Sequence, residues 1–120
     1  VTTPQPAAQK VAQRAAYMAE KVNVSVNGVV ENMSWFTGED GTRYQLFGEG
    51  GGQELAEQLG VPLLGRVPLI PALREGADTG NPVAADPSTE SGKVFEELAR
   101  AVDEDLKPTR RSHPELNLLG

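Results

Sequence analysis

Hydrophobic positions between residues 6 and 22 recur at the spacing of an α-helix. Apolar side chains fall at intervals of three or four residues, while lysine, arginine and glutamine mostly occupy the other faces. The apolar stripe comprises Val11, Ala15, Met18, Ala19 and Val22. This pattern predicts an amphipathic helix over residues 6–22, with Thr3 as its capping residue and prolines in its first turn.

Two short apolar segments predict buried strands. Residues 24–30 are rich in valine, and the consecutive Val29 and Val30 indicate that both faces of this strand are covered. Such coverage is typical of a parallel sheet between layers of helices. Residues 61–68 predict a second strand, which must stop at Pro68 because proline lacks an N–H donor.

The first five residues look like the end of a further strand. Val1, Thr2 and Thr3 are β-branched, and Pro4 ends the segment. The chain also opens without a methionine. We therefore expect it to be the C-terminal part of something longer.

Residues 34–47 predict a β-hairpin. An Asp-Gly pair at positions 40 and 41 is a turn signal between two segments rich in aromatic residues. The large apolar side chains of this hairpin are Trp35, Phe36, Tyr44, Leu46 and Phe47. They either pack on the domain's own core or form a contact patch for a partner, and the sequence leaves both possibilities open.

Three more helical segments are predicted. Residues 53–59 form a helix that ends at Gly60, a residue suited to a C-terminal cap. Residues 71–75 form a short helical segment, and a long helix starts at Pro87 and ends at Pro108. The buried stripe expected on the long helix comprises Val94, Phe95, Leu98, Ala99, Val102 and Leu106.

The order of these elements predicts the fold class. Strands separated by helices indicate half of an α/β sheet, in which each crossover helix links parallel strands, with an inserted β-hairpin. We expect this domain portion to cover residues 1–107. Residues 108–120 are mostly polar and predict a flexible tail.

Composition narrows the possible chemistry. A chain of 120 residues, 38% of them hydrophobic, can form one compact domain without disulfides. The absence of cysteine excludes a thiolate nucleophile and a zinc or iron–sulfur site built on the chain's own sulfur. The single histidine, His113, lies in the polar tail, which argues against imidazole catalysis. We therefore assign no catalytic residue and no metal ligand.

The charge balance argues against two classes of partner. The net charge is −6, and Arg110-Arg111 is an isolated basic pair, whereas binding to nucleic acid phosphates needs clustered lysine and arginine. No apolar run approaches the roughly 20 residues that span a bilayer, and no secretory signal is recognisable. We expect neither nucleic acid nor membrane as a partner, and a cytoplasmic location.

Residues 47–52 (FGEGGG) precede a predicted helix and at first suggest a phosphate loop. The detailed pattern does not match, because there is no Gly-Lys-Ser/Thr and Glu49 places a negative charge where phosphate would lie. We favour a flexible connection between hairpin and helix. Glu39 and Asp40, at the hairpin tip, are expected to be solvated turn residues rather than acid–base catalysts.

Two residues follow predicted parallel strands, where open α/β sheets gather their ligands. Asn32 follows the valine strand, and its amide can read the edge of an adenine. Pro68 follows the next strand and fixes the backbone beside a planar ring. Asparagine after a strand is also a common turn former, so both roles stay open for Asn32.

Several motifs, in the same order, closely resemble the C-terminal half of the Mrp/ApbC family. These proteins are MinD-like P-loop ATPases associated with iron–sulfur cluster delivery. The resemblance covers residues 1 to 107. The motifs are residues 1–5 (VTTPQ), 28–34 (GVVENMS), 47–52 (FGEGGG), 61–71 (VPLLGRVPLIP) and 74–76 (REG).

The resemblance implies the α/β fold class in full, namely the C-terminal half of a doubly wound, mainly parallel sheet with crossover helices and an inserted β-hairpin. It also implies ATP bound between the subunits of a homodimer, and slow hydrolysis coupled to clusters or iron–sulfur client proteins. By motif position, Asn32 looks like the adenine-reading asparagine, and Pro68 and Leu69 look like the segment beside the base. ATP and Mg²⁺ are implied for the full-length protein only. The family's phosphate-binding lysine loop and magnesium ligands lie upstream, so this chain alone should not hydrolyse ATP.

One stretch departs from the family. Many members carry a Cys-x-x-Cys pair between the Asn-Met-Ser and Phe-Gly-Glu-Gly-Gly-Gly segments, which is thought to hold a cluster bridging two subunits. Here residues 35–44 contain no cysteine, so a bridging [4Fe–4S] cluster of that kind cannot form on this chain. Our hypothesis is that the hairpin keeps the dimer contact by aromatic packing instead.

Two alternatives to a cluster-carrier ATPase remain. The first is a non-enzymatic partner-binding module that recruits a client through its aromatic hairpin or helix faces. The second is a partition or septum-positioning ATPase of the wider MinD group. Those proteins usually lack the Phe-Gly-Glu-Gly-Gly-Gly segment, and many of the septum-positioning type end in a basic amphipathic membrane helix, which this C-terminus does not resemble.

Overall fold

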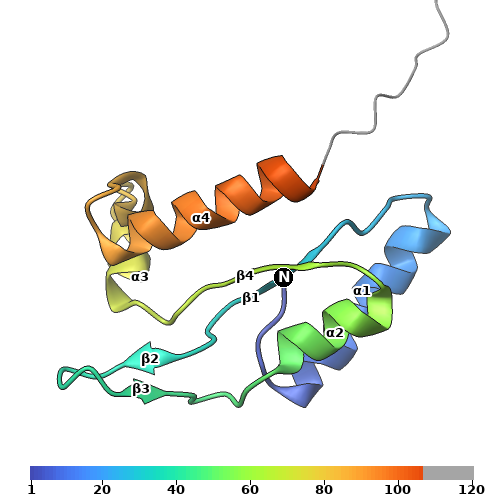
Figure 1. The fold of residues 1–120 in the computed structure, drawn as a ribbon, viewed down its shortest axis with the longest axis horizontal. Helices are drawn as coiled ribbons and strands as arrows, with labels where there is room; N and C mark the ends of the chain where they lie inside the picture. Colours follow the sequence, from blue (N-terminus) through green and yellow to red (C-terminus); the bar gives the residue numbers. More distant parts are fainter. Residues whose placement is uncertain (107–120) are drawn as a thin grey trace, which may run out of the picture.

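The computed structural model describes residues 1–106 (Figure 1). The elements are α1 (Pro6–Lys21), β1 (Val29–Glu31), β2 (Phe36–Thr37), β3 (Arg43–Tyr44), α2 (Gly51–Leu59), β4 (Leu63–Arg66), α3 (Pro71–Asp78), a 3₁₀ turn (Val83–Ala85) and α4 (Glu90–Asp105). The predicted tail, including His113, lies outside the described residues, and the domain boundary at residue 107 stays a prediction.

A small parallel sheet lies at the centre of the molecule. β1 pairs with β4 in parallel, with Glu31 opposite Arg66. On the other side of β1, Thr2 forms a parallel bridge to Glu31, so the N-terminal segment does behave as the end of a strand. In Figure 1, α1 and α2 lie side by side on one side of the strands and α4 lies on the other. Helices on both faces of a parallel sheet confirm the predicted fold class.

The hydrophobic core is built where α2 covers β1. Val29, Leu55 and Ala56 are buried together. Half-buried apolar side chains of α1, α2 and β4 pack against them, namely Ala12, Leu59, Val61 and Leu63. Burial of this apolar surface is the main favourable term that holds α2 on the sheet.

Helix α1 presents its apolar stripe to the outside. Val11, Met18 and Val22 are 66%, 60% and 60% exposed, and Ala12 makes the contact with the core instead. The predicted Thr3 cap is wrong: Gln5 occupies the N-cap position without a side-chain bond to the helix. The prediction of proline in the first turn is confirmed.

The valine strand is shorter than predicted. β1 starts at Val29, and residues 24–28 are not strand. The reason lies in the end of α1, where Asn23 adopts a left-handed conformation (φ 58°) and the Val24 N–H donates to the Ala19 carbonyl at 2.8 Å. This part of the valine run therefore closes the helix instead of extending the strand.

The other helices follow the predictions with shifted ends. α2 starts at Gly51 rather than at 53 and ends at Gly60, which takes the predicted left-handed cap (φ 66°). α3 continues to Asp78. α4 starts at Glu90 rather than at Pro87.

The start and the packing of α4 have a local cause. The Thr89 hydroxyl accepts a hydrogen bond from the Gly92 N–H at 2.9 Å and so caps the helix. The predicted buried stripe is only half right. Val94, Phe95 and Leu98 are half-buried, Leu106 is half-buried just beyond the helix, and Ala99 and Val102 are exposed.

The predicted hairpin is present and projects away from the helices at one end of the molecule (Figure 1). β2 and β3 pair in antiparallel fashion, with Phe36 opposite Tyr44. At the tip, Asp40 accepts hydrogen bonds from the Thr42 N–H at 3.0 Å and from the Thr42 hydroxyl at 2.9 Å. Glu39 and Asp40 are exposed, as expected of turn residues.

These two bonds generate a pH prediction. The Thr42 N–H and then the Thr42 hydroxyl favour the charged carboxylate and hold the pKa of Asp40 below its ordinary value. The stabilisation is present above the carboxyl's unfolded pKa and is lost as the pH falls through its folded pKa. Thr42→Val removes only the hydroxyl, so we expect an NMR titration to show the pKa of Asp40 rising part of the way to its ordinary value.

The matched control is Asp86. The Ser88 hydroxyl and N–H lower the pKa of Asp86, and this carboxylate should titrate identically in Thr42→Val and in the unaltered protein. An Asp40 pKa that does not move in the variant would contradict the assignment of the hydroxyl as a donor.

Candidate functional site

The carboxyl edge of the sheet brings the predicted ligand residues to the ends of neighbouring strands. Asn32 follows β1, and its N–H donates to the Thr2 carbonyl at 2.7 Å. Pro68 and Leu69 follow β4, and the Leu69 N–H donates to the Trp35 carbonyl at 2.7 Å. Both segments therefore lie where a parallel sheet offers a ligand site, while their role in binding stays a prediction.

The side chain of Asn32 is held by its own turn. Its Oδ1 accepts a hydrogen bond from the Met33 N–H at 2.9 Å, and Met33 has a left-handed backbone (φ 55°). Among residues 1–106 the amide makes no other hydrogen bond in the structure. One lone pair of Oδ1 and both N–H donors are thus available to a ligand.

Pro68 and Leu69 border a different space from Asn32. They line a cavity of about 70 Å³, which Asn32 does not reach. The other lining residues are Phe36, Thr37, Ile70, Pro71 and Glu90. Ligand pockets usually measure roughly 300 Å³ or more, so this cavity by itself does not hold a purine. The structure places the three predicted residues at one edge without joining them in one pocket.

Glu31 is the buried polar feature of this edge that the sequence reasoning did not single out. Its side chain is only 2% exposed, and one carboxylate oxygen, Oε2, accepts a hydrogen bond from the Gly52 N–H at 2.6 Å. The other oxygen lies 3.9 Å from Nε of Arg66, on the neighbouring strand. The sequence did contain one sign of this contact, a single charged residue at the end of an apolar strand. A charge in a buried position needs a partner.

The contact with Glu31 also explains the glycine segment. Gly52 is in the first turn of α2, where backbone N–H groups lack helical partners and attract anions. Glu31 already fills this anion position, which is the physical reason that the segment is not a phosphate loop. A Cβ at Gly52 would lie 2.7 Å from Cβ and 2.8 Å from Oε2 of Glu31. Gly51 and Gly52 are buried, so the prediction of a merely flexible connection is wrong there.

The large apolar residues of the hairpin differ in their exposure to solvent. Trp35 is half-buried, and the Arg43 guanidinium lies 4.5 Å from its ring centroid in a cation–π contact. Its Nε1 is buried without a hydrogen-bond partner in the described part of the chain. Tyr44 and Leu46, by contrast, are 46% and 57% exposed. The hairpin therefore both packs on its own domain and presents an apolar surface.

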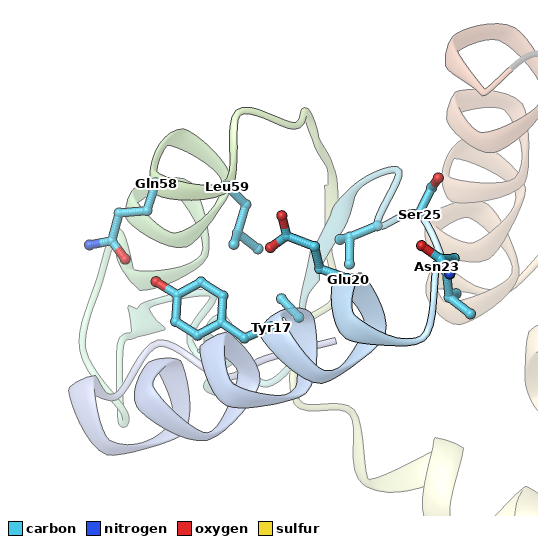
Figure 2. Close-up of a pocket in the computed structure, with 9 residues that line it drawn as sticks. Tyr17, Glu20, Asn23, Ser25, Gln58 and Leu59 are labelled. Atoms are coloured by element: carbon cyan, nitrogen blue, oxygen red, sulfur yellow. The ribbon is translucent and has the colours of Figure 1, made fainter.

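A cavity of about 570 Å³ lies between α1 and α2 at the opposite edge of the sheet (Figure 2). Figure 2 shows Tyr17 and Glu20 of α1 and Gln58 and Leu59 of α2 around it. The Tyr17 hydroxyl accepts a hydrogen bond from Nε2 of Gln13 at 3.0 Å. The cavity contains none of the predicted ligand residues.

Residues 1–106 contain neither a cluster of metal-ligating side chains nor a helix suited to cross a membrane. No group of three or more histidine, cysteine, aspartate or glutamate side chains there is arranged to hold a metal ion. No helix in the same range has the length and apolar character of a membrane span.

Comparison with known proteins gives matches over most of the chain. A family model described as NUBPL iron-transfer P-loop NTPase matches residues 1–103. Proteins named "Iron-sulfur cluster carrier protein" from Mycobacterium leprae and Bacillus subtilis are 48% and 41% identical to it, each over 86% of the chain. The chain spans only 28% and 29% of the length of these two relatives.

Solved structures show the same fold. The cell division ATPase MinD of Pyrococcus furiosus superposes with a TM-score of 0.65 at 23% identity, over 86% of this chain and 40% of that one. A nucleotide-binding protein from Archaeoglobus fulgidus, solved in complex with ADP, superposes with a TM-score of 0.57 at 36% identity. That match covers 68% of this chain and 34% of the other.

The packing of the glycine segment generates a stability prediction. A methyl group at Gly51 would collide with the Pro4 carbonyl and the Gln9 amide. We expect Gly51→Ala to lower the free energy of unfolding by about 1–3 kcal/mol, because overpacking forces the surrounding backbone to move. Equilibrium unfolding in urea measures the change.

Gln53→Ala, at an exposed position of the same helix, is the control and should stay within about 0.5 kcal/mol of the unaltered protein. Equal stabilities for both variants would show that residues 50–52 are loosely packed.

Proposed function

The chain belongs to the family of NUBPL iron-transfer P-loop NTPases, and on that premise we propose that it is the C-terminal portion of an ATP-binding iron–sulfur cluster carrier. In this proposal it supplies part of an adenine pocket and part of a dimer surface. The names of the relatives at 41–48% identity support the carrier role. The chain's span of about a third of the relatives' length supports its being a portion.

Asn32 is the proposed contact for the adenine base. The observation that carries this assignment is its amide, held by the Met33 N–H at the carboxyl edge of the sheet with two N–H donors and one lone pair unused. A relative of 36% identity has been solved with ADP, which supports a nucleotide as the ligand. Pro68 and Leu69 are proposed to lie beside the base, with the remaining walls of the pocket supplied from elsewhere.

Phosphate chemistry is proposed to take place outside this chain. Transfer of a phosphoryl group needs a lysine loop and Mg²⁺ around the γ-phosphate, and the sequence contains no Gly-Lys-Ser/Thr. The described residues fit a base through Asn32, but they present no acidic cluster that fits Mg²⁺. In this proposal the site of hydrolysis and its metal belong to other parts of the protein.

A cluster is cargo in this proposal and not a resident cofactor. The chain has no cysteine, so it provides no thiolate ligand for iron. We propose that its share in cluster transfer is to bind nucleotide and to pair subunits, with iron–sulfur client proteins as partners. The cytoplasmic location expected from the sequence stays a prediction.

The hairpin is the proposed dimer surface. Its exposed side chains Tyr44 and Leu46 give an apolar contact area, and its short strands leave backbone groups at their outer edges. Arg43, stacked on Trp35, stiffens the same region. These features support a homodimer that uses aromatic packing where other family members use cysteines.

A second candidate function has one observation in its favour. The exposed stripe of Val11, Met18 and Val22 on α1 is an unpartnered apolar helix face, which would suit a partner-binding module. In the carrier proposal the same face packs against the rest of the ATPase domain. Similarity to MinD at 22–23% identity shows the fold alone and does not favour a septum-positioning role.

The adenine contact predicts a base preference. Inosine triphosphate (ITP) carries a carbonyl where ATP has its exocyclic amino group, so this position of the base cannot donate to Oδ1 of Asn32, which the Met33 N–H holds in place. We expect the full-length protein to bind ATP about tenfold more tightly than ITP, the value of one good hydrogen bond, and Asn32→Ala to abolish this preference. Calorimetric titration with both nucleotides measures it.

Asn23→Ala, at the opposite edge of the sheet, is the control and should keep the preference. Retention of the full preference in Asn32→Ala would remove Asn32 from the pocket.

The dimer surface generates a separate prediction. Replacing both Tyr44 and Leu46 by serine removes the exposed apolar area of the hairpin. We expect the dissociation constant of the dimer to rise at least about tenfold. Sedimentation equilibrium of the full-length protein measures the dissociation constant. Tyr17→Ser, also at an exposed tyrosine, should leave it unchanged. Equal dissociation constants for the hairpin variant and the unaltered protein would count against the hairpin as the interface.

A further inference from the structure

The turn that presents Asn32 is strained. Met33 has a φ of 55°, a left-handed conformation that residues with a side chain rarely adopt. The bond from the Met33 N–H to Oδ1 of Asn32 closes this turn and orients the amide. A strained turn persists only where the surrounding structure over-determines it, and such turns gather at ligand sites.

Residues on both sides hold the turn in place. After the turn, Ser34 is buried: its N–H donates to the Val67 carbonyl at 3.0 Å and its hydroxyl to the Glu31 carbonyl at 3.1 Å. Before the turn, the Glu31 carbonyl also accepts from the Val67 N–H at 2.8 Å. The backbone is thus tied to the segment after β4 on each side of Asn32.

Glu31 adds a third connection, which runs to a helix. Its carboxylate accepts the Gly52 N–H at 2.6 Å, so the end of β1 is bound to the first turn of α2. The partial positive charge of that helix end favours the carboxylate. Glu31 is only 2% exposed, and a Cβ at position 52 would collide with its side chain, so β1 and α2 are closely packed at this point.

We propose that Glu31 is the positioning residue for the Asn32 amide. The inference rests on the proposed function, because it assumes that Asn32 reads the base. Glu31 does not touch the nucleotide in this account. It fixes the residue before the strained turn against α2, so that the amide of Asn32 faces the base in one orientation.

Two variants distinguish the hydrogen bond that Glu31 accepts from the charge that it carries. Glu31→Gln keeps an oxygen that accepts the Gly52 N–H, so the preference for ATP over ITP should stay within about twofold of the unaltered protein. Glu31→Val removes the acceptor, and the preference should fall at least fivefold, the value of a hydrogen bond of ordinary strength. Gly52→Ala pushes on the carboxylate from the helix side and should lower the preference in the same direction.

The full-length protein is titrated with ATP and with ITP for each variant. Gln53→Ala is the control in the same helix, since its side chain is exposed and, within residues 1–106, forms a hydrogen bond only with Glu57. If Glu31 had a purely structural role, its replacement would weaken the binding of ATP and of ITP equally. The ratio of the two affinities would then stay unchanged. A folded Glu31→Val or Gly52→Ala protein with the original ratio overturns the proposal.

A measurement on the unaltered protein keeps the test independent of folding. If nucleotide binding depends on the hydrogen bond between Glu31 and Gly52, a bound nucleotide must strengthen that bond in return. Exchange of the Gly52 amide hydrogen with solvent should therefore slow more with ATP than with ITP. Equal exchange in the free, ATP-bound and ITP-bound protein overturns the proposal. Asn32→Ala could lose the base preference while the Glu31 and Gly52 variants keep it. That result would support the proposed function and refute only the positioning role of Glu31. No preference in the unaltered protein would overturn both.

Discussion

The buried carboxylate of Glu31, bonded to the first turn of α2, is the contact on which the arrangement of the carboxyl edge depends. A charge taken out of water is costly unless hydrogen bonds and an opposite charge compensate it. Here the Gly52 N–H, the helix end and the nearby Arg66 provide that compensation. The arrangement requires a residue without a side chain at position 52, and it fills the anion site that the glycine segment would otherwise offer.

This contact determines which groups at the carboxyl edge remain free for a ligand. The N-terminus of α2 is occupied by the Glu31 carboxylate, so in the proposed site a nucleotide contacts the amide of Asn32 and not the glycines. The hairpin lies between β1 and α2 in the sequence, and its two ends are therefore set by the same contact. This is how, in the proposed function, a chain with no cysteine and about a third of its relatives' length takes part in nucleotide and subunit binding.

Sequence reasoning predicted the parallel sheet, the hairpin, and the end of α2 at Gly60, because these depend on local patterns such as valine runs, an Asp-Gly turn and a glycine cap. It failed at the ends of elements, where a single local hydrogen bond decides. Val24 closes α1 instead of pairing in a strand, and the Thr89 hydroxyl sets the start of α4. At the site, Asn32 could be placed at a strand end, but the pairing of Glu31 with Gly52 joins residues 21 positions apart and leaves no periodic signal.

A crystal structure of the full-length protein with ATP and Mg²⁺ tests the central claim most directly. The account predicts that the Glu31 carboxylate stays bonded to the Gly52 N–H while the base edge meets the Asn32 amide. A phosphate group seated on the first turn of α2, with Glu31 displaced from Gly52, would contradict it.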